Sequence, residues 1–349
     1  MALDQLTAMV ARDPLNTLRC FSVNPPGKMQ ELRRVRTVGV DESSLRFFSK
    51  RSAVQKDLGK LGSRFKSGEV TVPIAWIKFN IGNGLGPSEL MFDIEYAPTK
   101  DNPVDYTDVS PEFEKRIGGD RLPVFYLPWC PDHFVRMSIP EYKIESERDF
   151  GRGVEIDPYC PNLFFTAALS GCSVSVYGDP RRPTVVHVGT MGNTPYGDDC
   201  ATFWRELLMV ERLQRLHHGG SAYETNVDQY MGKTGSKTRF ESWLEMQPSN
   251  FTVERVANWG AVFGIRFGRL WSFYLQENAV IERYKIVKKQ KQVERTEKVL
   301  GLFNRKVTEI VDVSSTVQDT SVVPISVRPF FPAGGGQARI WDTFRKSYV

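Results

Sequence analysis

The chain of 349 residues is long enough for one large domain or two, and its composition (41% hydrophobic, 25% charged) is that of a globular protein. A net charge of +5 does not require a nucleic-acid or membrane partner, and no apolar run reaches the ~18 residues that a membrane-spanning helix needs. The five cysteines show no CxxC spacing, which argues against a zinc site and a complete disulfide framework, so we expect no metal and no cofactor.

Residues 1–66 are predicted to be an N-terminal accessory segment, interrupted at Asn24-Pro25-Pro26-Gly27. Scattered arginines among apolar residues indicate a solvated face, with a secretion or chaperone-binding segment as the alternative. The first residues lack the cationic and apolar regions of a Sec signal peptide, so any export is expected to use another route.

The next predicted elements are three strands. Residues 70–79 and 89–96 flank a glycine-containing turn that lacks the Gly-Lys-Ser/Thr of a phosphate loop, so we reject a nucleotide site. Residues 122–127 form the third strand, which ends at Pro128-Trp129. Trp129 is interpreted either as core or as one wall of a site.

A hairpin is predicted after the apolar residues 163–169, which we expect to form a short helix. Ser173 to Tyr177 alternates polar and apolar residues, Gly178 to Pro183 is a turn, and Thr184 to Val188 is rich in β-branched residues. If Tyr177 pairs with Thr184, then Val174 faces His187, and Cys172 lies diagonally from His187 on the same face.

This pair suits nucleophilic catalysis, because a thiol needs a nearby base to give the reactive thiolate. Gly171 would let a substrate carbonyl approach closely, and the N–H of Cys172 is a candidate oxyanion donor. Thr166 or a backbone carbonyl would orient His187. Two other interpretations stay open: Cys172 and His187 are structural, or a rival dyad forms from Cys130 and His133.

Further along the chain, residues 201–216 have the apolar spacing of an amphipathic helix, and the Trp-rich segments 240–247 and 253–275 are interpreted as core. Residues 281–303 are predicted to form a basic amphipathic helix, either solvated or docking an acidic partner. Residues 307–327 alternate as strands. We therefore divide the chain into the accessory segment, a catalytic domain at residues 67–280, and a C-terminal extension at residues 281–349.

Several motifs in this order resemble the Leu-Ser-Gly-Cys glutamine deamidase toxins. They are Leu127-Pro128-Trp129, Leu163-Phe164-Phe165-Thr166, Leu169-Ser170-Gly171-Cys172, Val186-His187 and Phe203-Trp204-Arg205, with a looser similarity around Asn258-Trp259-Gly260. Among these toxins the similarity is greatest to the Burkholderia lethal factor, and it extends distantly to the catalytic domain of cytotoxic necrotizing factor. It covers roughly residues 70–278.

The resemblance implies an α/β (α+β) fold: a mixed or antiparallel β-sheet sandwich with flanking helices and long loops. It implies that Cys172 is the nucleophile, His187 the base and Thr166 its associated group, with Trp129, Ser170 and Gly171 at the substrate. The interval from Cys172 to His187 is slightly longer than in the Burkholderia lethal factor, so the turn with Arg181 and Arg182 is expected to border the site.

The implied activity is that of a bacterial effector. It would be made in the bacterial cytoplasm, translocated into the host cytoplasm, and convert one glutamine of a host protein to glutamate. The victim could be an RNA helicase of translation initiation, so that initiation is blocked, or a small GTPase. Transglutaminase or cysteine protease activity with the same dyad, or a non-enzymatic binding module, are the alternatives. No nucleic-acid partner and no membrane insertion are expected, and no oligomeric state is predicted.

Overall fold

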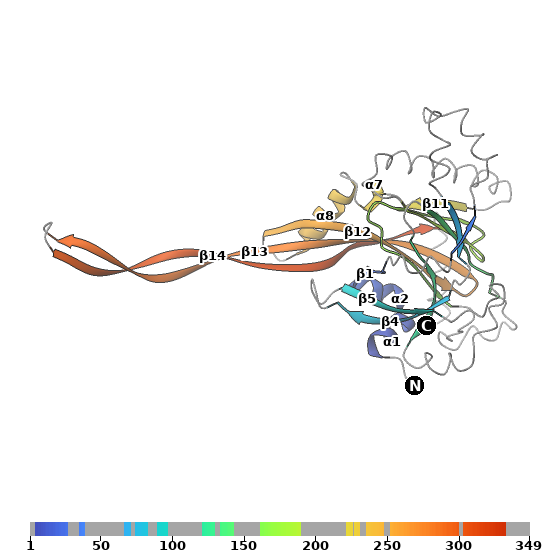
Figure 1. Ribbon diagram of the computed structural model, residues 1–349, viewed down its shortest axis with the longest axis horizontal. Helices are drawn as coiled ribbons and strands as arrows, with labels where there is room; N and C mark the ends of the chain where they lie inside the picture. Colours follow the sequence, from blue (N-terminus) through green and yellow to red (C-terminus); the bar gives the residue numbers. More distant parts are fainter. Residues whose placement is uncertain are drawn as a thin grey trace, which may run out of the picture.

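The computed structural model describes residues 4–26, 35–38, 66–70, 74–82, 89–96, 121–129, 133–142, 161–189, 221–225, 227–230, 235–247, 252–299 and 303–332. Strands dominate these residues, and they form two mixed sheets with a few short helices, which confirms the predicted α+β sheet fold (Figure 1). The predicted helix at residues 201–216 and the Phe203-Trp204-Arg205 motif lie outside the described residues.

The larger sheet, called sheet A, has eight strands. In spatial order they are β1 (Ser22–Asn24), β5 (Glu89–Tyr96), β4 (Ile74–Ile81), β6 (Leu122–Leu127), β8 (Leu163–Thr166), β12 (Thr252–Phe267), β13 (Leu270–Val299) and β14 (Phe303–Phe331). Four of them (β4, β5, β6 and β14) overlap segments predicted as strands from the sequence. The pairs β1–β5 and β6–β8 are parallel, and the others are antiparallel.

The smaller sheet, called sheet B, has six strands and contains the predicted hairpin. In spatial order they are β11 (Ser221–Thr225), β9 (Ser173–Gly178), β10 (Thr184–Val188), β7 (His133–Ser138), β3 (Lys66–Val70) and β2 (Val35–Val38). Only β3 and β7 run parallel.

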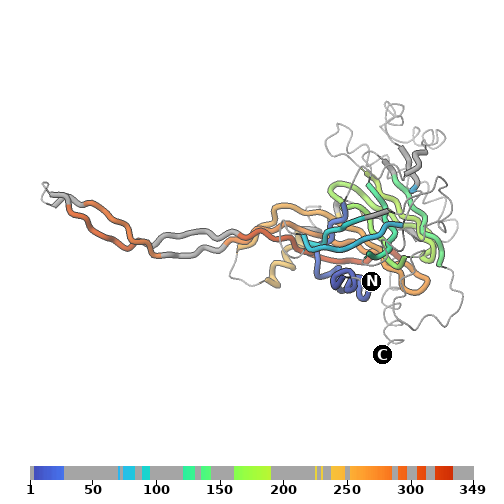
Figure 2. Tube along the Cα trace, turned by 60° about the horizontal axis from the view of Figure 1, so that its bottom comes forward, coloured from blue at the N-terminus to red at the C-terminus, as the bar shows by residue number. Residues whose placement is uncertain are grey.

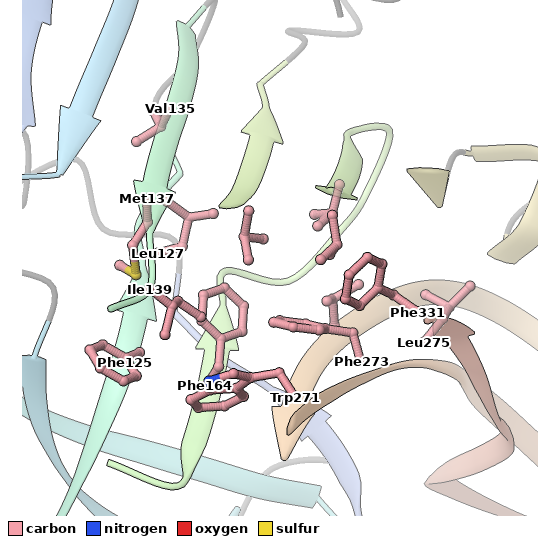
Figure 3. Packing of buried hydrophobic residues seen from close by; sticks show 14 of the residues in the cluster. Phe125, Leu127, Val135, Met137, Ile139, Phe164, Trp271, Phe273, Leu275 and Phe331 are labelled. Atoms are coloured by element: carbon pink, nitrogen blue, oxygen red, sulfur yellow. The ribbon is translucent and has the colours of Figure 1, made fainter. Parts of the chain in front are cut away.

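The main core lies between the two sheets, because alternate residues of their strands point to the same layer. Sheet A contributes mainly aromatic side chains, among them Phe164 and Phe273, and sheet B contributes aliphatic ones such as Val135 and Met137 (Figure 3). Phe164 packs edge-to-face on Phe273, with ring centroids 5.3 Å apart. Thr166, two residues after Phe164, therefore also points toward sheet B.

The opposite face of sheet A carries a second core, which is covered by two N-terminal helices, α1 (Gln5–Arg12) and α2 (Pro14–Cys20). Asp4 caps α1 by accepting from the N–H of Thr7 at 2.9 Å, and Asp13 caps α2. Gln276 of β13 then fixes the segment, since its amide oxygen accepts from Val23 N–H at 2.7 Å. Residues 4–26 are thus part of the central packing.

The C-terminal strands also belong to this packing, because β14 pairs with β13 and places Phe331 in the main core. The predicted boundary at residue 280 falls inside β13. The three proposed segments therefore contribute strands to one sheet.

Two predicted helices are wrong. Residues 163–166 form the central strand β8, and residues 167–169 follow it as irregular chain with an isolated bridge at Leu169. A short apolar run that is buried on both faces does not alternate, so its pattern does not distinguish strand from helix. Residues 281–299 continue β13, and helix α8 (Gly235–Glu245) covers only the adjoining part of the sheet.

The end of the β13–β14 hairpin projects from the body as a long twisted ribbon (Figure 1). The last partner of β13 in β12 is Thr252, opposite Tyr284. From Lys285↔Val317 to Val299↔Phe303, β13 and β14 pair only with each other among the described strands. We call residues 285–299 and 303–317 the ribbon arm. At ~3.3 Å per residue it extends roughly 50 Å.

Candidate active site

The predicted register of the hairpin is confirmed. Tyr177 pairs with Thr184, and Val174 pairs with His187. Cys172 lies immediately before β9 and packs in the main core together with Val174, which places it on the face of sheet B that carries His187. The hairpin therefore brings the predicted nucleophile and base to the same side of one sheet.

Thr166 meets His187 across the gap between the sheets. The Thr166 hydroxyl oxygen lies 2.7 Å from His187 Nδ1, and the same hydroxyl donates to the Leu127 carbonyl at 2.9 Å. A hydroxyl has one hydrogen, so with that hydrogen on Leu127 it accepts from His187 Nδ1–H. This assignment leaves the lone pair of the neutral imidazole on Nε2, the atom that a thiol proton would need to reach.

Burial keeps this imidazole neutral. His187 is 1% exposed, and desolvation lowers its pKa to about 3. Nε2 is buried and has no hydrogen-bond partner in the described structure. An unpaired acceptor in a core is costly, and a catalytic role is one of the reasons for which such an atom is retained. The imidazole is therefore held in its neutral form.

The loop before Cys172 has a fixed shape. Gly171 has φ of 123°, a conformation that residues with a Cβ rarely adopt. Two backbone hydrogen bonds join Leu169 to Gly260 of β12, at 2.7 and 2.9 Å. Gly171 therefore permits the chain to turn between the bridge at Leu169 and strand β9. The approach of a substrate carbonyl over Gly171 stays a prediction.

Tyr230, which the sequence did not point to, holds this loop from the side. Its hydroxyl accepts from Gly171 N–H at 3.0 Å and donates to the Cys172 carbonyl at 2.6 Å. Burial raises the pKa of the Tyr230 phenol well above its usual value, so the donor hydrogen is retained. Tyr230 fixes the backbone on both sides of the Gly171–Cys172 peptide bond.

Tyr230 is itself positioned by its neighbours. It ends the short helix α7 (Val227–Tyr230), and the Asn258 side chain donates to its carbonyl at 2.9 Å. Gly260 leaves space for the phenol ring, because a Cβ at that position would lie 2.9 Å from ring atom Cγ. Arg328 and Arg239 donate to the carbonyl of Gln229, at 3.0 and 2.5 Å. A lone tyrosine between polar residues gives no sequence signal for these long-range contacts.

The other predicted site residues lie around this group. Leu127 pairs with Thr166 in the parallel strands β6 and β8, so Pro128-Trp129 leaves sheet A beside Thr166. Trp129 is partly buried and packs on the main core, which supports its interpretation as core; its role as a wall of the site stays a prediction. Ser170 is exposed, whereas Cys172 is 4% exposed.

The turn with Arg181 and Arg182 does not border the site, which corrects the prediction. It follows β9, whereas Cys172 precedes β9, so the whole strand separates them by about 20 Å. Arg181 instead pairs with Asp179 at 2.6 Å. Of the rival dyad, Cys130 and the side chain of His133 lie outside the described residues.

In the part of the chain that the structure describes, no cluster of three or more His, Cys, Asp or Glu side chains could hold a metal ion. Among the same residues, no helix has both the length and the apolar character needed to cross a membrane. Searches against protein-family models and against curated proteins give no match to this chain.

Proposed function

We propose that this chain is a glutamine deamidase that uses Cys172 and His187 to convert one glutamine of a host protein to glutamate. The observation that carries the proposal is the Thr166–His187 hydrogen bond, because it selects the tautomer in which Nε2 can accept a proton. The resemblance of the Leu-Ser-Gly-Cys segment to the deamidase toxins supplies the substrate class.

The reaction would proceed in two halves. His187 Nε2 accepts the Cys172 thiol proton, and the thiolate adds to the glutamine carboxamide carbon. The tetrahedral intermediate collapses when its nitrogen takes the proton from His187, so ammonia leaves and a thioester remains. His187 then accepts a proton from water, the resulting hydroxide attacks the thioester, and the proton returns to the departing thiolate. The product is glutamate and the free enzyme.

Thr166 has a positioning role in this scheme. It keeps a hydrogen on Nδ1 without introducing a buried carboxylate, so the resting Thr166–His187 pair is uncharged. Burial makes the imidazolium a strong proton donor to the leaving nitrogen, and to the same extent makes Nε2 a weaker base toward the Cys172 thiol. Tyr230 holds the backbone of Cys172 in place while the Cys172 sulfur forms and then breaks its bond to the substrate carbon.

The test is peptide mass spectrometry of eukaryotic lysate after treatment with the full chain or with a Cys172→Ala variant. One glutamine converted to glutamate only by the intact protein is the expected result, and the modified peptide identifies the target. A translation-initiation RNA helicase and a small GTPase are the two victims named by the resemblance. Incorporation of a labelled amine would instead indicate a transglutaminase, and new peptide termini a protease.

A second candidate is a non-enzymatic binding module, favoured by the 4% exposure of Cys172. Iodoacetamide labelling separates the two, because Cys20 is an exposed free cysteine in the same chain and gives an internal reference. Two results together would establish a non-enzymatic function. Cys172 would stay unlabelled while Cys20 reacts fully, and the Cys172→Ala variant would keep its biological activity.

A further inference from the structure

The ribbon arm has two open edges. It consists of two strands without a third neighbour among the described residues, and a lone two-stranded ribbon is only marginally stable in water (Figure 2). Open edges present unpaired N–H and C=O groups along their length. The arm thus has the geometry to accept another strand.

The positive charge of the arm is concentrated on one of these edges. Residues 285–299 of β13 contain six Lys/Arg and two Asp/Glu, whereas residues 303–317 of β14 contain two of each. Lys306 pairs with Glu294 at 3.4 Å, but Lys291 and Arg295 are exposed and take part in no ion pair among the described residues. The β13 edge therefore carries the excess of cations.

The register places these cations on a shared face with valines. Lys291 is opposite Val311, and Arg295 is opposite Val307. Facing residues of an antiparallel pair lie on the same face, so Lys291 and Arg295 (the cation row) lie beside Val311 and Val307 (the valine row), with Val293 and Glu309 between them. Val311 is 37% exposed and Val293 is 40% exposed.

Three other occupants fit this surface poorly. The arm twists along its length, so its apolar face cannot lie flat on a lipid surface (Figure 1). A second copy would bring the same cations against the edge. Nucleic acid would meet the valine row and the carboxylate of Glu309, which faces Val293.

Within the body of the protein, the same edge of β13 is occupied by a neighbouring antiparallel strand. As far as Tyr284 that edge is occupied by β12, which pairs with β13 in antiparallel register. Beyond Tyr284 the same edge continues without a partner among the described strands. A strand from another protein can pair with β13 beyond residue 284, where β12 has ended. Its carboxylates would then lie on the same face as the cation row.

We infer that the β13 edge of the ribbon arm, residues 285–299, binds an extended acidic segment of a partner protein as an added strand. Main-chain hydrogen bonds give this mode its affinity, and alternate side chains give its specificity. Carboxylates at every second residue would all reach the face that carries Lys291 and Arg295. The inference is independent of the chemistry at Cys172.

The first experiment measures fluorescence anisotropy of labelled synthetic peptides with the full chain. The probe is a peptide of about 15 residues, enough to span the edge, with Glu at every second position and Thr or Val between. A composition-matched peptide has all its Glu in one block. Two further peptides keep the sequence of the probe but are N-methylated on either the odd or the even residues.

The alternating peptide should bind, and the block peptide should bind about tenfold more weakly or not at all. N-methylation of one parity should abolish binding while the other parity has little effect, because only one edge of the added strand donates to β13. Equal binding of all four peptides would mean attraction between charges without strand addition and would overturn the inference, as would no binding at low salt.

The matched variants carry the same change in net charge. Lys291→Glu/Arg295→Glu should weaken binding of the alternating peptide by about tenfold or more, whereas Lys237→Glu/Lys306→Glu should not, because Lys237 lies on α8 and Lys306 on the other face of the arm. Equal effects of the two variants would overturn the inference. So would tighter, Lys291-dependent binding of duplex DNA or of phosphatidylserine vesicles than of the peptide.

Discussion

The body around Cys172 and the ribbon arm share the two strands β13 and β14 but differ in what surrounds these strands. At Phe273, β13 is one of eight strands and is buried between layers. At Val293, β14 is its one neighbour among the described strands, and the side chains of residues 291–296 are exposed. The comparison teaches that strand length alone does not determine stability, because most of the stabilisation of a sheet comes from the faces that it buries. Substitutions should therefore have large effects in the body and small ones in the arm.

The largest effect expected is the dependence of stability on pH through His187. Its folded pKa of about 3 lies below the unfolded value of about 6.5. Above pH 6.5 both states are neutral, so the contribution is fully present. As the pH falls from 6.5 toward 3, His187 becomes protonated in the unfolded state but stays neutral in the folded state. The free energy of unfolding therefore drops by up to about 1.4 kcal/mol per pH unit.

Urea unfolding at pH 4.5, 5.5 and 7 would measure this slope in the wild type and in His187→Gln. The variant lacks the titrating group, so its slope should be smaller over this window. Lys291→Gln in the arm should leave the slope unchanged. Parallel slopes in the wild type and His187→Gln would contradict the burial of a neutral imidazole.

Gly260→Ala should have the next largest effect. The new Cβ would lie 2.9 Å from the Tyr230 ring, which is fully buried and cannot move freely. We expect a loss of about 1–3 kcal/mol in the free energy of unfolding, typical of overpacking. Gly82→Ala is the control, because its Cβ would meet the flexible Met91 side chain. Equal losses in the two variants would mean that Tyr230 is not confined by Gly260.

Tyr230→Phe removes only the hydroxyl between Gly171 and Cys172. The Gly171 N–H and the Cys172 carbonyl lose these bonds, which should cost about 1–2 kcal/mol in chemical unfolding. Tyr230→Leu, which also removes ring packing, should cost more. If the proposed deamidation holds, Tyr230→Phe should lower kcat more than it changes KM, since the hydroxyl touches the backbone of the nucleophile. An unchanged kcat would assign Tyr230 a purely structural role.

The smallest effect belongs to the arm. Val311→Ala removes a side chain that is already 37% exposed, so the loss in thermal or urea unfolding should stay within about 0.5 kcal/mol. Val262→Ala, a fully buried valine of β12, is the matched change in the body and should cost well over 1 kcal/mol. Similar losses in the free energy of unfolding for Val311→Ala and Val262→Ala would contradict the expectation that substitutions matter more in the body than in the arm.

The sequence predicted the hairpin of the candidate site better than the connections around it. The turn at residues 178–183 and the β-branched run to Val188 determined the register that pairs Val174 with His187. The strand β8 was mistaken for a helix because both of its faces are buried, which removes the period of two. Residues 281–303 were predicted to be a helix because their apolar residues among lysines match both the helical period of 3.6 and the strand period of 2. The face that they share with the valines of β14 can be seen only from the pairing of β13 with β14.

Tyr230 could not be found by pattern at all. It lies 58 residues from Cys172 along the chain, and its contact depends on Gly260 and Asn258 of another strand. Such contacts are products of the tertiary fold and leave no local periodicity. The same holds for Gln276, which fixes the N-terminal segment from 253 residues away.

The Thr166–His187 pair places the proposed catalytic imidazole inside the core layer between the two sheets. Because its members are neutral at rest, they can be enclosed by aromatic and aliphatic side chains without a buried ion. If His187 is the catalytic base, selection for a well-folded sandwich and selection for catalysis then act on the same few positions. If the proposed deamidation and strand addition hold, variants at Thr166 and its neighbours should lose abundance and activity together. Exposed positions of the arm tolerate substitution better, so partner specificity could diversify while the chemistry stays the same.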